Sequence, residues 1–313
     1  MKLDFMILGA AKAGTSSMSH IVSGHPDVCM SDPRESKFFS KHYHRGPAYL
    51  FERFFPHWSG QTFLCEADTA NLYVPYVAER IHRLFPDVKL VALLRDPVDR
   101  AFSDWWMHYT VGKESLPFEG AVERALEQLK GGSLFERPDA QAIWEEHLAA
   151  MEKGRMTWRR YLDAGYYAPQ IREYWRVFGR ERLLILFAED FRRDPECQLR
   201  RLWDFLGLDG VAVDGDPSLN ESWSVRGAAI LRHVQRRGIV RMVPEPVRRW
   251  VRSKIREGRK PVLDPKLASF LSEHYRGWNE DLFSLLGSRR SWKGTTTPPH
   301  PARLGDGSPE SQP

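Results

Sequence analysis

A glycine-framed loop near the N-terminus has the spacing of a phosphate-binding loop. Residues 9–17 read Gly-Ala-Ala-Lys-Ala-Gly-Thr-Ser-Ser, with four residues between the two glycines. Small residues let backbone N–H groups surround a phosphate, and a helix that begins directly afterwards adds donors and a favourable dipole. A nucleotide triphosphatase has lysine directly after the second glycine. Here that position is Thr15, and the lysine, Lys12, lies inside the loop. Ordinary strand-to-helix turns also use small residues, so the loop alone leaves both interpretations open.

A second segment carries groups that suit a phosphate. Arg95 follows the apolar run 88–94, and Ser103 lies about two turns into the helix expected after Pro97. The guanidinium offers a fork of donors and the serine a hydroxyl, so both can converge on one phosphate. Arg-Asp-Pro alone commonly marks the start of a helix. The two segments together, in this order, favour a bound phosphorylated ligand.

Both segments resemble those of sulfotransferases that use 3′-phosphoadenosine-5′-phosphosulfate (PAPS). Residues 12–17 resemble the family's 5′-phosphosulfate loop, and residues 93–103 are similar to its 3′-phosphate segment, R-x-P-x-x-R-x-x-S. The resemblance implies that PAPS is the sulfuryl donor, that its desulfated form PAP is a product, and that no metal is needed. It assigns the donor to Lys12, Ala13, Gly14, Thr15, Ser16, Ser17, Arg95 and Ser103.

Weaker matches follow in the same order as far as about Trp292. Residues 34–39 look like the K-E-x-H-F-F segment of the heparan-sulfate type and its bacterial relatives, and residues 66–73 resemble the segment after the next strand. Gly165-Tyr166-Tyr167 with Ile171 is similar to G-L-Y-x-x-x-L, which implies that Tyr167 contacts the donor. Arg226 and Gly227 stand where a family loop closes over the 3′-phosphate and adenine.

The resemblance implies catalytic roles for two residues. Glu35 is the expected general base for the acceptor, and Lys12 is expected to stabilise charge on the leaving phosphate. A solvated Glu35 paired with Arg34 or Lys37 is the alternative. Lys37 and Asp68 are tentative substrate contacts, although Lys37 also fits a surface lysine and Asp68 a helix cap.

Two departures concern the acceptor. Lys37 stands where many relatives have histidine, and Asp68 where the heparan-sulfate type has lysine. A heparan-like acceptor is therefore not implied, and the comparison favours a soluble bacterial branch.

Apolar runs alternating with helical stretches predict the fold. Strands are expected at 5–8, 28–30, 63–65, 88–94 and 183–187, and helices at 15–24, 74–85, 195–206 and 264–286, with a mostly helical middle at 98–178. This order predicts an α/β, P-loop-like three-layer fold: a central parallel sheet with helices on both faces and a helical C-terminal part. A single domain is expected over 1–293. The tail 294–313, rich in Pro, Gly, Ser and Thr, is expected to be disordered.

The charge distribution bears on partners. The chain carries a net charge of +5, but residues 226–260 alone carry twelve Lys or Arg and two Glu. The remainder is net acidic, which argues against a nucleic-acid-binding protein. The block includes an amphipathic helix at 246–255, for which core packing is the commonest explanation and a membrane surface or an anionic acceptor the alternatives. The aromatic clusters around Trp105, Trp158 and Trp175 are expected in the core rather than in an acceptor pocket.

Other features bear on the compartment and the class of protein. The three cysteines are far apart, no N-terminal signal peptide is recognisable, and no apolar run is long enough for a bilayer. These features favour the cytoplasm. A P-loop kinase and a non-catalytic nucleotide-binding scaffold are the alternatives to a sulfotransferase. The acceptor stays open among a small molecule, a glycan and a lipid, as does the oligomeric state.

Overall fold

A five-stranded parallel sheet forms the centre of the protein. The computed structural model describes residues 1–210 and 260–292. The strands are β1 (Phe5–Gly9), β2 (Val28–Met30), β3 (Phe63–Ala67), β4 (Lys89–Leu94) and β5 (Leu183–Phe187), in the order β2-β3-β1-β4-β5. Nearly every strand residue is buried, as expected for a parallel sheet covered on both faces. The predicted α/β class is therefore confirmed.

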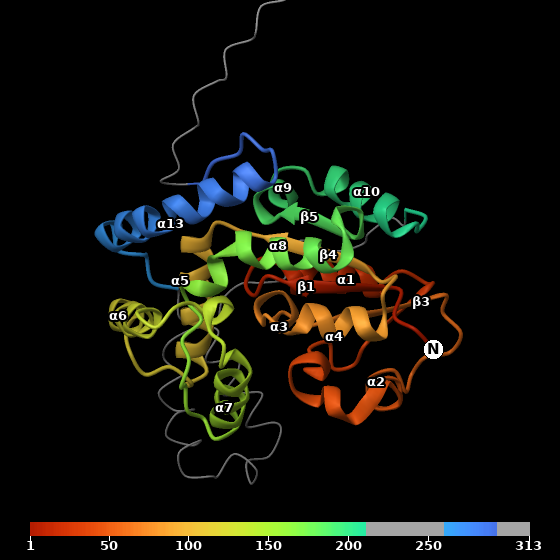
Figure 1. Cartoon of the computed structure of the whole chain (residues 1–313). Coiled ribbons are helices and arrows are strands. Elements are labelled where there is room, and N and C mark those ends of the chain that lie inside the picture. Colours follow the sequence, from red (N-terminus) through yellow and green to blue (C-terminus); the bar gives the residue numbers. More distant parts are fainter. Residues whose placement is uncertain (211–259, 293–313) are drawn as a thin grey trace, which may run out of the picture.

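Helices cover the two faces of this sheet. They are α1 (Thr15–Ser23), α2 (Gly46–Phe54), α3 (Ala70–Tyr73), α4 (Val77–Leu84), α5 (Pro97–Thr110), α6 (Phe118–Leu129), α7 (Ala140–Glu152), α8 (Tyr167–Phe178), α9 (Ala188–Arg193), α10 (Pro195–Leu206) and α13 (Pro265–Leu285). Short turns are η1 (Phe38–His42), η2 (Tyr43–Arg45), η3 (Leu134–Glu136), η4 (Asp163–Gly165) and η5 (Arg180–Arg182). The β1–β2 and β3–β4 connections run in opposite directions, so right-handed crossovers place α1 and α4 on opposite faces. Figure 1 shows α4 and α8 in front of the strands.

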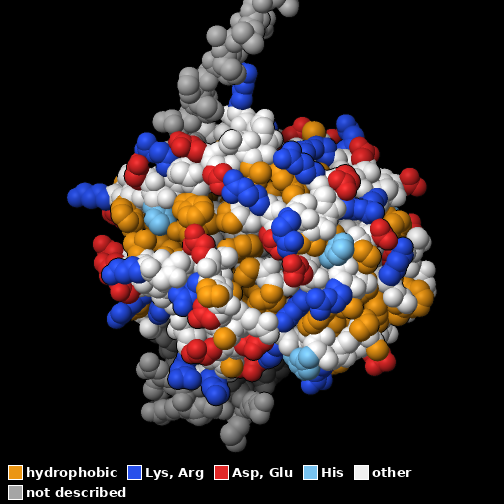
Figure 2. Space-filling model, viewed as in Figure 1, with side chains coloured by type: hydrophobic (Ala, Val, Ile, Leu, Met, Phe, Trp, Pro, Cys, Tyr) orange, Lys and Arg blue, Asp and Glu red, His pale blue; other side chains and the backbone are white. Residues whose placement is uncertain are grey.

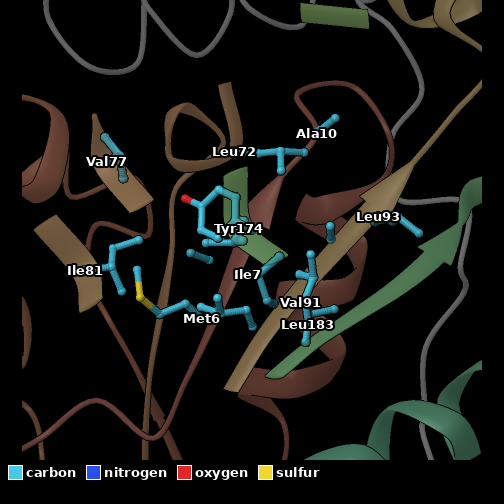
Figure 3. Packing of buried hydrophobic residues seen from close by; sticks show 14 of the residues in the cluster. Met6, Ile7, Ala10, Leu72, Val77, Ile81, Val91, Leu93, Tyr174 and Leu183 are labelled. Atoms are coloured by element: carbon cyan, nitrogen blue, oxygen red, sulfur yellow. The ribbon is translucent and has the colours of Figure 1, made fainter. Parts of the chain in front are cut away.

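Two hydrophobic cores hold these layers together. In the larger core, Tyr174 of α8 and Ile81 of α4 pack with Met6 and Ile7 of β1 (Figure 3). The second core lies among α5, α6, α13 and residues 161–166, and it contains Trp105 and other large aromatic side chains. This second core fixes α5, the helix that follows Arg95, against the C-terminal helix α13.

Two element predictions were wrong in detail. The helix expected over 74–85 is α4, which begins only at Val77, because Val74 is extended before Pro75, as residues preceding proline usually are. The short helix α3, just before it, was not predicted. The strand expected to end at Cys65 continues to Ala67 and includes the buried Glu66. Its carboxyl group accepts hydrogen bonds from Ser36 and Asn71, which satisfy a buried polar side chain that the apolar pattern did not predict inside the strand.

Several predictions fall outside the described residues. They are the donor-loop residues Arg226 and Gly227, the amphipathic helix 246–255 and the tail 294–313. Among the described residues, no helix combines the length and the apolar character needed to span a membrane. On the face seen in Figure 2, lysine and arginine are interspersed with aspartate and glutamate, as on an ordinary solvated surface.

Candidate active site

A cavity of about 990 Å³ opens at the carboxyl ends of the strands. Loops that follow β1, β3, β4 and β5 supply Lys12, Asp68, Arg95 and Ala188 to its lining. The carboxyl ends of parallel strands meet at one edge of the sheet, which is where open α/β sheets bind ligands. The fold thus brings together residues that are far apart in the sequence.

The glycine-framed loop forms one wall of this cavity. Gly14 has φ 106°, a left-handed conformation that side chains beyond glycine rarely adopt, and α1 begins directly after it. No side chain caps α1 within the described part of the chain. The first-turn N–H groups, which lack partners inside the helix, are therefore suited to an anion. Ala13, Gly14, Thr15, Ser16 and Ser17 all line the cavity, as does Lys12.

Arg95 and Ser103 approach the same cavity from β4 and α5. Asp96 caps α5 by accepting the N–H groups of Val98 and Asp99, which fixes the helix start. Arg95 donates from Nη1 to the carbonyl oxygen of Lys12 at 3.0 Å. Its Nε is buried and has no hydrogen-bond partner in the part of the chain described. An unsatisfied buried donor of this kind fits an anionic ligand.

Tyr167, predicted to contact the donor, lies behind Arg95 and does not line the cavity. Its hydroxyl donates to the carbonyl oxygen of Arg95 at 2.9 Å. The preceding Gly165 packs so closely that an added Cβ would lie 2.8 Å from Cβ of Pro97 and 3.0 Å from the ring of Tyr275. This glycine-tyrosine segment therefore holds the end of β4 and the start of α5 in place.

A buried carboxylate gathers the cations of this wall. Asp104 of α5 lies 3.3 Å from Nη1 of Arg100 and 3.4 Å from Nε of Arg160, with Nδ1 of His108 at 3.5 Å. Burial alone would raise the pKa of Asp104, but Arg160, His108 and Arg100 outweigh it and hold the pKa at about 2. Burial lowers the pKa of Lys12, and attraction to Asp104 opposes that change.

Glu35 lines the cavity and is exposed. It accepts a hydrogen bond from Thr69 Oγ1 at 3.2 Å. The neighbouring Arg34 bonds to the phosphate loop, donating from Nη1 to the carbonyl oxygen of Ser16 at 3.0 Å. Glu35 is solvated, as the alternative interpretation expected, but the hydrogen bonds of Arg34 go to Ser16. Arg34 instead connects the segment carrying Glu35 to α1.

Two carboxylates at the end of β3 hold the backbone around Glu35. Ser36 donates from Oγ to Glu66 Oε1 at 2.6 Å, and the N–H of Lys37 donates to Asp68 Oδ2 at 2.7 Å. The other oxygen of Asp68 accepts the N–H of Ala70 at 2.9 Å, at the start of α3. Burial, followed by repulsion from Glu35, raises the pKa of Asp68 to about 6. Asp68 therefore stabilises the turn before α3 and holds the backbone of the loop that carries Glu35. Lys37 extends an exposed side chain at the cavity.

Sequence reasoning missed several residues that the helical middle and the C-terminal part bring to the cavity. Among them are His108, Lys113, His147, Arg160, Arg192 and Lys260. Trp158 was expected in the core; it is buried, yet it also lines the cavity. These residues share no motif, because their meeting depends on how α5, α7 and the segment after α7 pack. Within residues 1–210 and 260–292, no group of three or more His, Cys, Asp or Glu is placed to hold a metal ion.

The glycine loop and the cationic wall at the strand ends define an α/β protein built to bind a phosphorylated ligand. The chain belongs to the sulfotransferase domain family, whose model matches residues 2–282. The resemblance inferred from the sequence is therefore confirmed.

Individual relatives support this membership. The human bifunctional heparan sulfate N-deacetylase/N-sulfotransferase 3 is 26% identical over 290 residues, covering 90% of this chain and 29% of that protein. The mouse heparan sulfate glucosamine 3-O-sulfotransferase 3A1 is 24% identical, covering 92% of this chain and 64% of that protein. The chain thus spans less than two thirds of the length of these relatives. A solved sulfotransferase structure from Alicyclobacillus acidocaldarius shares the fold, with a TM-score of 0.62, 24% identity and coverage of 92% and 97% of the two chains.

Proposed function

We propose that this protein transfers a sulfuryl group from PAPS to a hydroxyl or amine of an acceptor. The observation that carries the proposal is one cavity lined by Lys12, Arg95, Ser103 and Glu35. Groups suited to two phosphates and a carboxylate suited to a proton thereby share a single space. Family membership supports the same reaction class.

The donor is assigned to the phosphate-loop side of the cavity. The N–H and hydroxyl groups of residues 13–17 would hold the 5′-phosphosulfate, and Arg95 with Ser103 would hold the 3′-phosphate. The unsatisfied Nε of Arg95 supports this assignment. Arg226 and Gly227, proposed to close over the 3′-phosphate and adenine, lie outside the described residues.

The residues present account for the movement of bonds and protons. The acceptor oxygen or nitrogen forms a bond to sulfur while the bond between sulfur and the 5′-phosphate oxygen breaks. Glu35 takes the acceptor's proton as general base, and Lys12 stabilises the negative charge that grows on the leaving phosphate. Asp104 supplies the counter-charge that keeps a cation favourable at Lys12. The reaction as written requires no metal.

The proposal also keeps the roles of Lys37 and Asp68 and the cellular location that the sequence predicted. Lys37 and Asp68 lie on the acceptor side of the cavity, where Lys37 would contact the sulfuryl group or the acceptor. Asp68 would contact the substrate as well, while its Oδ2 accepts the backbone N–H of Lys37. A P-loop-like donor site, a cytoplasmic location and a place in a bacterial branch are part of the same proposal.

Nucleotide-dependent stabilisation tests the donor assignment. PAP should raise the melting temperature, because a ligand that binds only the folded state stabilises it. AMP lacks the 3′-phosphate and should raise it much less. Arg95→Ala should abolish this preference for PAP, whereas Lys2→Ala, an exposed lysine at the N-terminus, should leave it unchanged. Equal stabilisation by the two nucleotides in the unmodified protein would show that Arg95 and Ser103 do not form a 3′-phosphate site.

A further inference from the structure

The cavity has a second region that the donor assignment does not use. Beyond Glu35 its walls come from the end of α5, from α7 and from the segment after α7. Six large apolar side chains line this region: Met107, Trp144, Leu148, Met151, Met156 and Trp158. None belongs to the glycine loop, to Arg95 or to Ser103, so these side chains form a separate wall of one continuous space.

The cavity is large for a ligand pocket. Pockets of about 300–1,000 Å³ accommodate a drug-sized ligand. At about 990 Å³, this cavity lies at the upper end of that range. The residues assigned to the donor line only part of this space, and the apolar wall lines another part.

The polar groups within this wall are neutral or already paired. Nδ1 of His147 accepts the backbone N–H of Trp158 at 3.2 Å, which leaves the proton on Nε2. Burial, with Arg160 nearby, lowers the pKa of His147 to about 3, so the ring is uncharged at neutral pH. Glu152 at the end of α7 forms an ion pair with Lys41. The described side chains of this wall thus carry little unpaired charge of their own.

Cations of the described residues lie near both this wall and Glu35, since Arg160, Lys113 and Lys37 act on His147 as well. Burial lowers the pKa of Lys113, repulsion from Lys37 and Arg160 lowers it further, and attraction to Glu35 opposes them. Lys113 is therefore close enough to Lys37, Arg160 and Glu35 for their charges to affect its pKa. A polyanionic sugar chain would need cations spaced along its length, and a neutral sugar would need many hydrogen-bonding groups. Within residues 1–210 and 260–292, the wall of Trp144, Met151 and Trp158 offers neither arrangement.

We propose that the acceptor is a small hydroxyl compound with an apolar, aromatic or alkyl body, which packs against Trp144, Met151 and Trp158 while its hydroxyl reaches Glu35. This inference rests on the proposed function and specifies its substrate class. Methionine side chains adapt their shape to the ligand, so Met107, Met151 and Met156 suit a range of apolar bodies. An acceptor of this kind differs from the glycan acceptors that the names of the relatives indicate.

Binding of 2-naphthol to the full chain saturated with PAP tests the inference. Tryptophan fluorescence should report binding, because Trp144 and Trp158 line the wall. Met151→Gln and Met156→Gln keep the size of the side chain but make it polar. Each should weaken naphthol binding by about tenfold, and raise KM for naphthol sulfation similarly, while leaving the PAP-induced shift in melting temperature unchanged. Phe270→Gln, at an exposed residue of α13 outside the cavity, is the matched control and should have no effect.

The outcomes separate the two proposals. If PAP raises the melting temperature but 2-naphthol does not bind, or if the methionine variants bind it as well as the unmodified chain, the apolar acceptor is wrong. Preferential binding and sulfation of a heparan-derived disaccharide would overturn it in favour of a glycan. If PAP has no effect on the melting temperature, the failure lies in the proposed donor site.

Discussion

Lys12 shows how one residue separates this site from a triphosphatase. Its backbone has φ 69°, a left-handed conformation uncommon outside glycine, and it lies within the loop rather than after it. Arg95 holds its carbonyl oxygen, and Asp104 attracts its ammonium. The lysine is thus positioned by groups from β4 and α5, and not by the loop alone.

Replacing Lys12 tests its role in the transition state. Lys12→Ala should lower kcat by about a hundredfold, because charge on the leaving phosphate grows along the reaction. The affinity for PAP should fall much less. Turnover with PAPS and calorimetric binding of PAP measure the two effects, with Lys2→Ala as control. A variant with near-normal kcat would mean that Lys12 only shapes the loop.

Replacing Glu35 tests the assignment of the base. Glu35→Gln keeps the size and the hydrogen-bond acceptor for Thr69 but cannot take a proton, so kcat should fall by about 10²–10⁴-fold with PAP affinity retained. Glu123→Gln, at an exposed carboxylate of α6 outside the cavity, is the matched control and should stay near the unmodified rate. If Asp68→Asn abolishes turnover while Glu35→Gln is nearly normal, the acceptor approaches from the Asp68 side.

At the scale of elements, the end of β3 controls the loop that carries Glu35. Glu66 and Asp68 bond to Ser36 and to the backbone of Lys37, so a strand end fixes residues 36 and 37 from across the site. A buried carboxyl group of this kind makes the free energy of unfolding depend on pH. Burial and Glu35 raise the pKa of Asp68 to about 6, so the folded state binds its proton more tightly than the unfolded chain does.

The resulting prediction concerns pH. Between about pH 4 and 6 the folded protein holds more protons at Asp68, so this residue's contribution to stability falls as pH rises through that range. Asp68→Asn should remove that component. From pH 4.5 to 6.5, the free energy of unfolding of the unmodified protein should therefore fall relative to that of the variant by on the order of 2 kcal/mol. Urea unfolding at the two pH values measures it, and parallel behaviour of both proteins would contradict it.

Local signals explain which elements the sequence could predict. β5 and α10 match their predicted bounds, because an apolar run and an Asp-Pro helix start followed by Gly207 mark their ends. The sequence did not predict Glu66 inside β3, because the hydrogen bond that allows its carboxyl group to be buried comes from Ser36, thirty residues away. Sequence motifs predicted Lys12, Glu35 and Arg95 as site residues, and all three line one cavity. Arg160 and Lys113 line it too, but no local pattern in the sequence marks them. Their positions result from tertiary packing of the helical middle.

At the scale of the whole molecule, the cavity concentrates positive charge from distant parts of the chain. Among the described lining residues, seven are Lys or Arg and three are Asp or Glu. The last of these cations along the chain, Lys260, lies 4.6 Å from the centre of the Phe102 ring. Burial, and then repulsion from Arg95, lowers the pKa of Lys260 to about 8, with Asp99 opposing. Lys260 lies far along the chain from the glycine loop, yet both line the cavity proposed to hold the nucleotide.

This arrangement predicts that nucleotide binding takes up protons under mildly alkaline conditions. At pH 8.5 Lys260 is partly deprotonated in the free protein, and the phosphates of PAP, with pKa values near 6, are fully ionised. Anionic phosphates beside Lys260 favour its charged form and raise its pKa, so a fraction of a proton should be absorbed on binding. Calorimetry in two buffers of different ionisation enthalpy measures this uptake. Lys260→Arg keeps the positive charge at every accessible pH and should bind PAP with less proton uptake. Equal uptake in both proteins would assign the proton to another lysine, and Lys260 would then lie outside the field of the nucleotide.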